Sequence, residues 1–481
     1  MNGNNIKKCE HTYKQFNIYF LYNIMECVVA VGNNLGISTE NDDIPWKLPD
    51  DLKHFKNLTK GHIVIMGLKT YHSLPIKPLP DRTNIIITHQ PELYTSDGSL
   101  MFMTYDECMV HIDEFETSQK YFVIGGEDIY KLFQPHITVI HMTQVLHKQP
   151  ISFNKFFFKI PNTFELTEVS SMYINNETSF RFLKYTLAEN LVNHDEEYIR
   201  LSKYILENGE TRKDRTNTGT ISVFAQQMKF DIQNTIPILT TKRVPWKSCI
   251  EELLWFLKGN TNANDLDKIG VKIWNANSSR EFLDNVGLNH LQPGDCGANY
   301  SFQWKHFGAS YIDFNHQYDN QGVDQIAYIE HLLKHDKHSR RIFLSAWNPS
   351  DLKNTVLPPC HVSAQFYVDN DDYLHCHMYQ RSCDMFLGIP WNILSYSVLT
   401  YIFAIRNDLK PGTLTMSTGD THIYKNHIEQ MKLQISRPSL CSPKLILNPE
   451  IKNLDFSEMS SNDFDLVGYF PHPTIKGEMS A

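Results

Sequence analysis

Short apolar runs that alternate with helical patterns fill the first part of the chain. A helix is expected at 52–57, after the first β-rich run. The β-rich runs lie at 27–31, 62–66, 84–88 and 121–124. This order favours an α/β unit with a mixed, largely parallel sheet, and two later runs, 138–143 and 179–186, are expected to add strands at one edge.

A different pattern follows a short polar stretch. A helical face begins near Glu197, and a helix at 246–257 is apolar on nearly all sides, so it is expected in a core. Further β-rich runs lie at 341–346, 361–368 and 373–379. The chain therefore divides into an N-terminal extension, an α/β domain, a short linker and an α+β domain. We place these parts at 1–25, 26–187, 188–194 and 195–481.

Composition narrows the class of protein. With 481 residues, 41% of them hydrophobic and 21% charged, the chain has the make-up of a multidomain globular protein. Its formal charge of -9 excludes a polycation that neutralises nucleic-acid phosphates, so an anion site must be a local cluster of arginines. Nine cysteines without a CxxC pair predict reduced thiols in the cytoplasm, and no metal site is predicted. The apolar stretch at 16–25 is too short to span a bilayer, so we expect no membrane anchor.

Two features of the first domain suit a flat heterocycle and a dinucleotide. Asp51 and Phe55 lie four residues apart on the expected helix, which places a carboxylate beside an aromatic ring. A helix cap is the simpler interpretation of that carboxylate. Gly125-Gly126 follows a strand and opens a helix, and Gly67 stands at a second such junction. A tight turn explains either junction alone, but two beside one sheet favour a pyrophosphate bound by backbone amides.

These residues, in this order, resemble dihydrofolate reductase across 26–187. The match rests on Ala30, Pro45-Trp46, Asp51, Phe55, Gly67, Thr70, Pro80-Asp81-Arg82, Gly125-Gly126, Tyr130 and Thr143. The resemblance implies that Asp51, aided by Thr143, binds and helps to protonate the pteridine. It also implies that the folate contacts Ala30, Phe55 and Arg82. The implied NADPH site is lined by Ala30, Gly67, Lys69, Thr70, Thr88, Gly125, Gly126 and Tyr130.

One position departs from this pattern. Leu68 stands where the family usually has an arginine close to the 2′-phosphate of the cofactor. A guanidinium there would bind the phosphate as a bidentate partner, which leucine cannot do. We therefore expect a weaker preference for NADPH over NADH.

The second domain combines a cysteine with scattered arginines. Cys360 follows two prolines and precedes a β-rich run. Most cysteines are small buried hydrophobes, but a nearby guanidinium favours the thiolate. The arginines that we consider are Arg215, Arg340, Arg341 and Arg381. Each alone is more often a surface charge, whereas together, in an acidic protein, they favour a phosphomonoester site.

Other polar side chains add to this picture. Glu252 lies inside the apolar helix, where it is either a buried hydrogen-bond anchor or a proton relay. Asn392, His422 and Tyr424 supply an amide, an imidazole and a phenol, which suit a pyrimidine edge and a sugar hydroxyl.

These segments resemble thymidylate synthase over about 195–481. The match rests on Thr240 to Arg243, Glu252 to Leu257, Pro359-Cys360-His361, Gln380 to Asp384 and Gly419 to His422. The resemblance implies that Cys360 attacks C6 of dUMP and that 5,10-methylenetetrahydrofolate is the co-substrate. The implied dUMP site comprises Arg215, Arg340, Arg341, Arg381, Ser382, Asp384, Asn392, His422 and Tyr424. The implied proton-transfer and folate region comprises Glu252, Trp274, Asn277, Tyr300 and His361. Departures from the family pattern occur at Ser278, Ala298-Asn299 and Ser301.

The two implied reactions form one cycle, because the synthase releases the dihydrofolate that the reductase consumes. From 26 to 481 the chain resembles the bifunctional dihydrofolate reductase-thymidylate synthases of protozoa. The resemblance implies a homodimer through the synthase domain, in which Arg340 and Arg341 reach the partner's phosphate pocket, and it requires neither membrane nor nucleic acid. Two alternatives stay open: only the synthase is active, or the chain is a folate-binding or RNA-binding regulatory protein. The presence of Asp51, Glu252 and Cys360 argues against the second.

Overall fold

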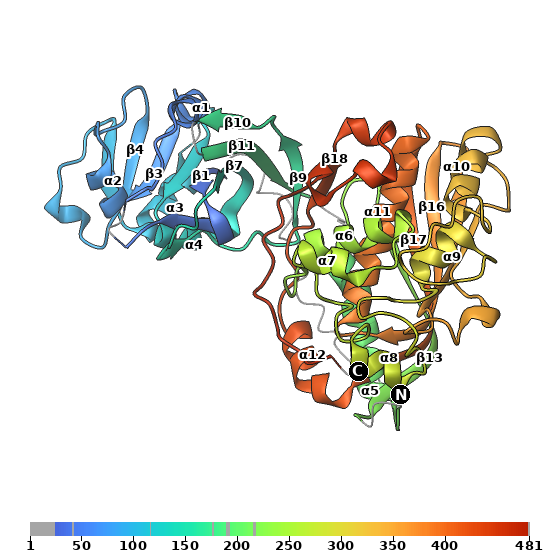
Figure 1. Cartoon of the computed structure of the whole chain (residues 1–481). Helices are drawn as coiled ribbons and strands as arrows, with labels where there is room; N and C mark the ends of the chain where they lie inside the picture. Colours follow the sequence, from blue (N-terminus) through green and yellow to red (C-terminus); the bar gives the residue numbers. More distant parts are fainter. Residues whose placement is uncertain are drawn as a thin grey trace, which may run out of the picture. The chain divides into compact units, whose positions relative to one another are not determined.

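The chain forms two compact units, which are described separately (Figure 1). The computed structural model describes residues 25–40, 43–115, 117–175, 178–188, 193–214 and 218–479. The first unit consists of Met1–Ile160 and Phe164–Glu189, and the second of Pro161–Thr163 and Asn190–Ala481. Apart from Met25, the predicted N-terminal extension lies outside the described residues, and so does Arg215.

A mixed sheet forms the centre of the first unit, as the sequence predicted. Its strands are β1 (Met25–Val31), β3 (Ile63–Gly67), β4 (Thr83–Ile87), β5 (Leu100–Met103), β6 (Tyr121–Gly125), β7 (Ile137–His147), β9 (Phe164–Val169), β10 (Tyr173–Asn175) and β11 (Thr178–Leu187). The order is β10-β11-β7-β1-β6-β3-β4-β5, with β9 paired to β11. The strands from β7 to β5 are parallel, and β11 joins β7 in the antiparallel sense. A small separate pair consists of β2 (Gly36–Ser38) and β8 (Lys155–Phe156).

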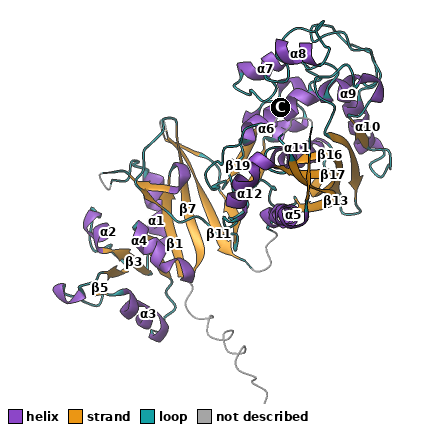
Figure 2. Ribbon diagram, turned by 90° about the horizontal axis from the view of Figure 1, so that it is seen from below, coloured by secondary structure: helices purple, strands orange, loops and turns teal. Residues whose placement is uncertain are grey.

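Four helices flank this sheet (Figure 2). They are α1 (Pro49–Thr59), α2 (Leu68–Ser73), α3 (Tyr105–Glu114) and α4 (Glu127–Phe133). The first begins earlier than the expected 52–57, because Pro49 has the fixed φ that suits the first helical position. Val28, Met66 and Phe122 form a buried cluster against which Phe55 and Leu68 pack. This cluster holds α1 and α2 over one face of the sheet.

The second unit is an α+β fold around a second mixed sheet. Its strands are β12 (Glu210–Arg212), β13 (Thr220–Asp231), β14 (Phe343–Ser345), β15 (His361–Val368), β16 (Tyr373–Asp384) and β17 (Lys410–Tyr424). A separate two-stranded antiparallel sheet consists of β18 (Lys444–Leu447) and β19 (Phe464–Val467). The order is β12-β13-β17-β16-β15-β14, in which β16 and β17 are parallel. Its helices are α5 (His194–Asn208), α6 (Trp246–Leu257), α7 (Ala263–Lys268), α8 (Arg280–Asn285), α9 (Tyr300–His306), α10 (Gln325–His335), α11 (Gly388–Arg406) and α12 (Ile428–Ile435).

The core of the second unit lies between this sheet and two buried helices. The predicted helix at 246–257 is α6, and it contacts α11, which the sequence analysis did not identify. One apolar window of α11 is long enough to cross a membrane, but 72% of it is buried inside the unit, as in a core helix. Phe366 on β15 meets Phe403 on α11 edge to face, at 5.2 Å between ring centroids. α11 therefore covers the buried face of the sheet.

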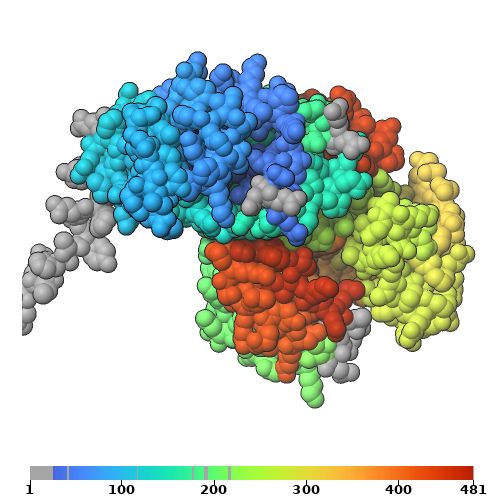
Figure 3. All heavy atoms as spheres, turned by 90° about the vertical axis from the view of Figure 1, so that its left-hand side faces the viewer, coloured from blue at the N-terminus to red at the C-terminus, as the bar shows by residue number. Residues whose placement is uncertain are grey.

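The C-terminal tail is held on the second unit, where Figure 3 shows it in red. The carbonyl of Glu478 accepts a hydrogen bond from Nε2 of His427 at 2.8 Å. A side chain at Gly477 would lie 2.6 Å from the ring of Phe386, so only glycine fits this close approach. Phe386 follows the end of β16, so the tail lies near residues predicted to bind dUMP.

Candidate active sites

Asp51 and Thr143 meet in the first unit. Asp51 lies in the first turn of α1, and the hydroxyl of Thr143 on β7 donates to its Oδ1 at 2.6 Å. Ala30 on β1 pairs with Thr143, so the three predicted folate residues lie together. Burial raises the pKa of Asp51 above its ordinary value, while the hydrogen bond from Thr143 opposes that rise. This carboxyl therefore holds a proton more readily than an exposed aspartate does.

Phe55 and Arg82, two further predicted folate residues of the first unit, lie beside each other. The guanidinium of Arg82 lies 5.6 Å from the centroid of the Phe55 ring. Its Nε donates to the Pro80 carbonyl at 3.0 Å, and its Nη1 donates to Thr59 Oγ1 at 2.9 Å. Arg82 is buried, so it is not a solvated surface charge. Its fixed orientation beside an aromatic ring suits a carboxylate attached to a flat ligand.

The two glycine junctions lie side by side. Gly67 precedes α2 and Gly126 precedes α4, and neither helix has a side-chain cap. A Cβ on Gly126 would lie 3.4 Å from Thr70 Oγ1. The uncapped N–H groups of both first turns fit the pyrophosphate of a dinucleotide such as NADPH. At Gly125 φ is 108°, which favours glycine.

The other predicted cofactor residues have different surroundings. The hydroxyl of Tyr130 donates to the Val28 carbonyl at 2.7 Å, which connects α4 to β1, and its ring fills the space where a side chain at Gly125 would lie. Leu68 packs in the apolar cluster beneath α2, whereas Lys69 is exposed. At the end of β4, the hydroxyl oxygen of Thr88 accepts from the N–H of Gln90 at 3.3 Å.

In the second unit, Cys360 lies between a tyrosine and an arginine. Its backbone N–H donates to the hydroxyl oxygen of Tyr300 at 2.6 Å. Arg381 donates to the carbonyls of Pro358 and Pro359, both at 2.8 Å, and its Nη2 lies 4.0 Å from Cys360 Sγ. The sequence analysis expected the guanidinium to favour the thiolate. Burial has the larger effect and raises the pKa of Cys360, while Arg381 and Tyr300 lower it.

Glu252 is held by two tryptophans. Trp274 Nε1 donates to its Oε1 at 2.8 Å, and Trp391 Nε1 donates to its Oε2 at 2.6 Å. Burial raises the pKa of Glu252 to about 7, although both indoles favour the ionised form. The carboxyl is therefore an anchored group that can gain or lose a proton near neutral pH.

Tyr300 also stacks on His361. The two rings are 3.9 Å apart and nearly parallel, with an interplanar angle of 11°. His361 Nδ1 lies 2.8 Å from the hydroxyl of Tyr396 on α11. Burial lowers the pKa of His361 to about 3, so the imidazole is neutral at physiological pH. The predicted residue Asn277 is buried in the same unit.

Most of the predicted nucleotide-binding residues gather where β16 and β17 end. Ser382 pairs with Asp420, and Asp384 pairs with His422. His422 Nδ1 lies 3.0 Å from Asp420 Oδ1, and its ring meets Tyr424 edge to face at 5.1 Å. Nearby, Asn392 Oδ1 accepts from Gln380 Nε2 at 3.1 Å, which orients the amide.

Within one chain, the described arginines do not form a single cluster, and the prediction that Arg340 and Arg341 reach the partner's phosphate pocket stays a prediction. Arg340 and Arg341 are exposed and precede β14. Because Phe343 pairs with Gln365 in the antiparallel sense, Arg341 lies beside the far end of β15. At a rise of about 3.3 Å per residue, it is roughly 20 Å along the strand from His361. Only Arg381 lies beside Cys360 among the described arginines.

The residues that depart from the family pattern form hydrogen bonds or pack within the second unit. Ser278 Oγ donates to the Trp274 carbonyl at 2.9 Å, and Ser301 Oγ donates to the Trp255 carbonyl at 3.3 Å. Asn299 Oδ1 caps α9, and Ala298 packs in an apolar cluster. In the described part of the chain, no group of three or more His, Cys, Asp and Glu side chains could hold a metal ion.

Several residues that contact the predicted site residues were not identified from the sequence. Trp391 is separated from Glu252 by 139 positions, and no spacing pattern joins them. Tyr396 lies in the unidentified α11. Arg212 donates to Asp420 Oδ2 at 2.9 Å and so supports the His422 pair. Nothing in the sequence marks this pair, because exposed arginines of this kind are common.

Comparisons with known proteins cover both units. The chain matches the family model for dihydrofolate reductase over residues 24–187 and that for thymidylate synthase over residues 196–481. It is 42% identical to the bifunctional dihydrofolate reductase-thymidylate synthase of Paramecium tetraurelia, over 94% of this chain and 98% of that protein. Similar proteins of the same description come from Zea mays, at 40% identity over 95% and 96%, and from Leishmania major, at 37% identity over 94% and 94%.

Proposed function

Since the chain belongs to the family of bifunctional dihydrofolate reductase-thymidylate synthases, we propose how its residues divide the two reactions. The protein converts dUMP to dTMP with 5,10-methylenetetrahydrofolate, which leaves as dihydrofolate. It then reduces dihydrofolate to tetrahydrofolate with NADPH. We assign the reductase to 26–187, the synthase to 195–481 and the linker to 188–194.

The residues around Cys360 are the main support for assigning the synthase reaction to the second unit. The Cys360 thiolate forms a bond to C6 of dUMP, and the π electrons move toward C5 and O4. C5 then attacks the methylene carbon. Loss of the C5 proton and cleavage of the bond between the methylene carbon and the folate nitrogen leave an exocyclic methylene on the pyrimidine. A hydride from the tetrahydrofolate reduces this methylene to methyl as the thiolate leaves C6, which gives dTMP and dihydrofolate. Arg381 lowers the pKa of the thiol, and Tyr300 fixes the loop that carries it. Glu252, with a pKa of about 7, exchanges the protons that these steps require.

The remaining synthase residues bind and orient the substrates. Arg215, Arg381 and Ser382 hold the phosphate, Asn392 and Asp384 face the base, and His422 and Tyr424 face the ribose. Trp274, Asn277 and His361 line the folate side. The ordered set of hydrogen bonds at the ends of β16 and β17 supports this assignment, because it fixes the polar groups before substrate binds.

The pair of Asp51 and Thr143 carries the reductase assignment. Asp51 holds the pteridine and supports its protonation, Phe55 packs on the folate, and Arg82 binds the glutamate carboxylate. NADPH supplies the hydride. Its phosphates are held by the backbone at Gly67 and Gly126 and by Thr70 and Lys69, while Ala30, Thr88, Gly125 and Tyr130 complete the site.

The separation of the two sites has a direct test. Cys360→Ala should abolish dTMP formation yet leave NADPH-dependent reduction of dihydrofolate within a few fold of the wild type. Loss of both activities in a folded variant would contradict two separate sites. A chain that binds folate but performs neither reaction would instead be a regulatory protein.

A homodimer through the synthase sheet explains the position of Arg340 and Arg341. The sheet face opposite α11 leaves large side chains exposed, among them Tyr367 at 64% and Phe343 at 45%. A second copy of the chain would bury this apolar face. The exposed arginines lie at its edge, just before β14, too far from their own Cys360 to reach it. We infer that they bind the phosphate in the partner's site.

Mixed dimers test this arrangement. Cys360→Ala and Arg340→Ala/Arg341→Ala homodimers should both be nearly inactive. After joint unfolding and refolding, about half the dimers are mixed and each has one intact site, so roughly a quarter of the wild-type activity should return. If tagged subunits exchange and no activity returns, the arginines act within their own chain.

We propose a cytoplasmic location without a membrane or nucleic-acid partner. The eight described cysteines are free thiols, and all except Cys360 are buried, as expected in a reducing compartment. Fractionation of the source cells tests this location, and recovery of both activities in a membrane pellet would oppose it.

A further inference from the structure

His361 is a neutral imidazole enclosed by aromatic rings. Tyr300 stacks on one of its faces, and Tyr396 meets it edge to face at 5.4 Å. Since burial lowers the pKa of His361 to about 3, one ring nitrogen carries a proton and the other a lone pair. Which nitrogen carries the proton decides whether the free side of the ring is a hydrogen-bond donor or an acceptor.

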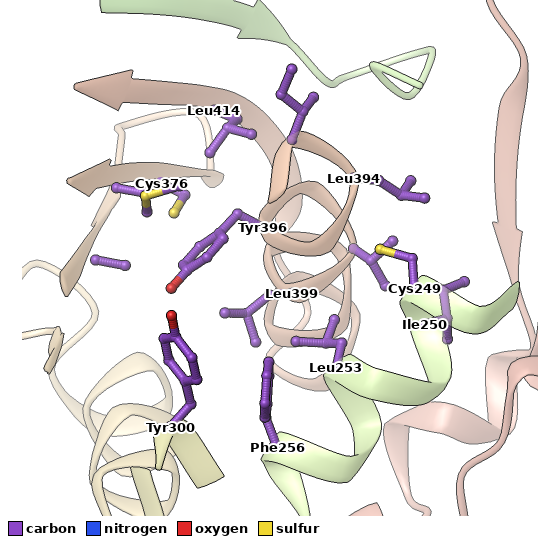
Figure 4. Close-up of a cluster of buried hydrophobic side chains, with 14 of the residues drawn as sticks. Cys249, Ile250, Leu253, Phe256, Tyr300, Cys376, Leu394, Tyr396, Leu399 and Leu414 are labelled. Atoms are coloured by element: carbon purple, nitrogen blue, oxygen red, sulfur yellow. The ribbon is translucent and has the colours of Figure 1, made fainter. Parts of the chain in front are cut away.

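The hydroxyl of Tyr396 is the group that selects between these two tautomers of His361. Tyr396 lies in the middle of α11, and its buried ring extends past Cys376 of β16 toward Tyr300 of α9 (Figure 4). Among the hydrogen bonds of the described residues, its hydroxyl has one partner, His361 Nδ1, at 2.8 Å. Burial raises the pKa of the phenol well above its ordinary value, so it keeps its proton.

The hydroxyl of Tyr300 is the other polar group nearby. Figure 4 shows it facing the hydroxyl of Tyr396, but no hydrogen bond within the described residues joins the two. The Tyr300 oxygen already accepts from the N–H of Cys360. A buried O–H that is left without an acceptor costs about 1 to 3 kcal/mol, and His361 Nδ1 is the one acceptor that the described hydrogen bonds offer it, so the Tyr396 proton points to Nδ1.

We propose that Tyr396 is a positioning residue of the synthase site, which donates its hydroxyl proton to Nδ1 of His361. The imidazole is thereby held as the tautomer protonated at Nε2. That N–H is the donor left for the uracil, the folate or a water between them. Tyr396 acts only through His361 and does not touch the substrate. This inference rests on the proposed synthase site around Cys360.

Two tyrosines on α11 allow a matched comparison. Tyr396→Phe removes the hydroxyl and keeps the ring. It should lower kcat for dTMP formation by about tenfold, the value of one hydrogen bond, with KM for dUMP unchanged within about twofold. Tyr401→Phe removes a hydroxyl from the same helix, where it donates to the Ile232 carbonyl at 2.7 Å. This control should keep kcat within about twofold, because its partner lies outside the site.

A double-mutant cycle separates positioning from folding. In a His361→Ala background, Tyr396→Phe should cause no further loss of kcat, because its only route to the reaction is gone. A further tenfold loss there would overturn the proposal. So would a kcat for Tyr396→Phe equal to that of Tyr401→Phe.

Neutron diffraction from crystals of the whole chain reads the tautomer directly. Deuterium should lie on Nε2 of His361 in the wild type, and deuterium on Nδ1 would contradict the proposal. If Cys360→Ala still makes dTMP, the synthase site itself is misplaced. If that variant is inactive while Tyr396→Phe behaves as its control, only the inference about Tyr396 fails.

Discussion

The burial of Glu252 predicts how the rate of dTMP formation depends on pH. Its pKa rises from 4.5 to about 7, which corresponds to about 3 kcal/mol at about 1.4 kcal/mol per unit. This is the net cost of ionising the buried carboxyl after the indoles of Trp274 and Trp391 have stabilised its charge. If the reaction needs the protonated form, kcat for dTMP formation should fall above about pH 7. The fall follows from the sign of the shift, because ionisation is complete above the raised pKa.

Glu252→Gln removes the titration. The amide oxygen can accept from one indole, but its NH2 group would face the N–H of the other tryptophan. We expect kcat to fall at least about 100-fold, the lower end of the usual contribution of a general acid or base, and the inflection near pH 7 to disappear. Formation of dihydrofolate without NADPH gives the synthase rate alone, and dihydrofolate reduction serves as the internal control. A variant that keeps the inflection, or retains its rate within a few fold, would refute this role.

Trp391→Phe is the matched control for the pKa. It deletes a donor to Oε2 without removing the carboxyl, so the pKa of Glu252 should rise further. The alkaline fall in kcat should then move to higher pH by roughly one to two units, since a hydrogen bond to a charged group contributes about 1.5 to 3 kcal/mol. An inflection that stays in place would mean that another group titrates.

Three further variants test the reductase and the fold. Asp51→Asn should slow NADPH-dependent reduction of dihydrofolate about 100-fold or more, with partial recovery at low pH, where solvent supplies the proton; a normal rate at neutral pH would move the role elsewhere. Leu68→Arg should raise the ratio of kcat/KM for NADPH over NADH, and an unchanged ratio would mean that Lys69 already binds the 2′-phosphate. Asp195 has a pKa raised from 3.8 to about 6, so the folded chain retains a proton that the unfolded chain loses. The contribution of Asp195 to the free energy of unfolding should therefore fall by up to about 3 kcal/mol between pH 4 and 6. In urea titrations over this pH range, Asp195→Asn should no longer show this part of the pH dependence.

The sequence pattern predicted those features that lie within a single helix or strand. The apolar helix at 246–257 and the strand at 361–368 have the bounds that the sequence predicts. Asp51 and Phe55 lie on one helix, so the periodicity of α1 places them together. The helix α11 was missed because apolar residues on all sides give no periodic face to mark it.

Contacts between distant segments were not predictable in this way. Glu252 stood out as a buried carboxylate, but its two indole partners follow from tertiary packing alone. The arginines formed one set by composition, whereas the strand register places Arg341 far from Cys360. The tyrosine at 396 had no signal at all, because nothing in its helix distinguishes a functional hydroxyl from a core ring.

The coupling of the two reactions is the most direct test of the whole account. Purified chain is given dUMP, NADPH and 5,10-methylenetetrahydrofolate, and both dTMP formation and NADPH oxidation are followed. One NADPH should be oxidised for each dTMP formed, and omission of dUMP should stop both. Formation of dTMP with accumulating dihydrofolate and no oxidation of NADPH would contradict the account, because the first unit would then be no reductase.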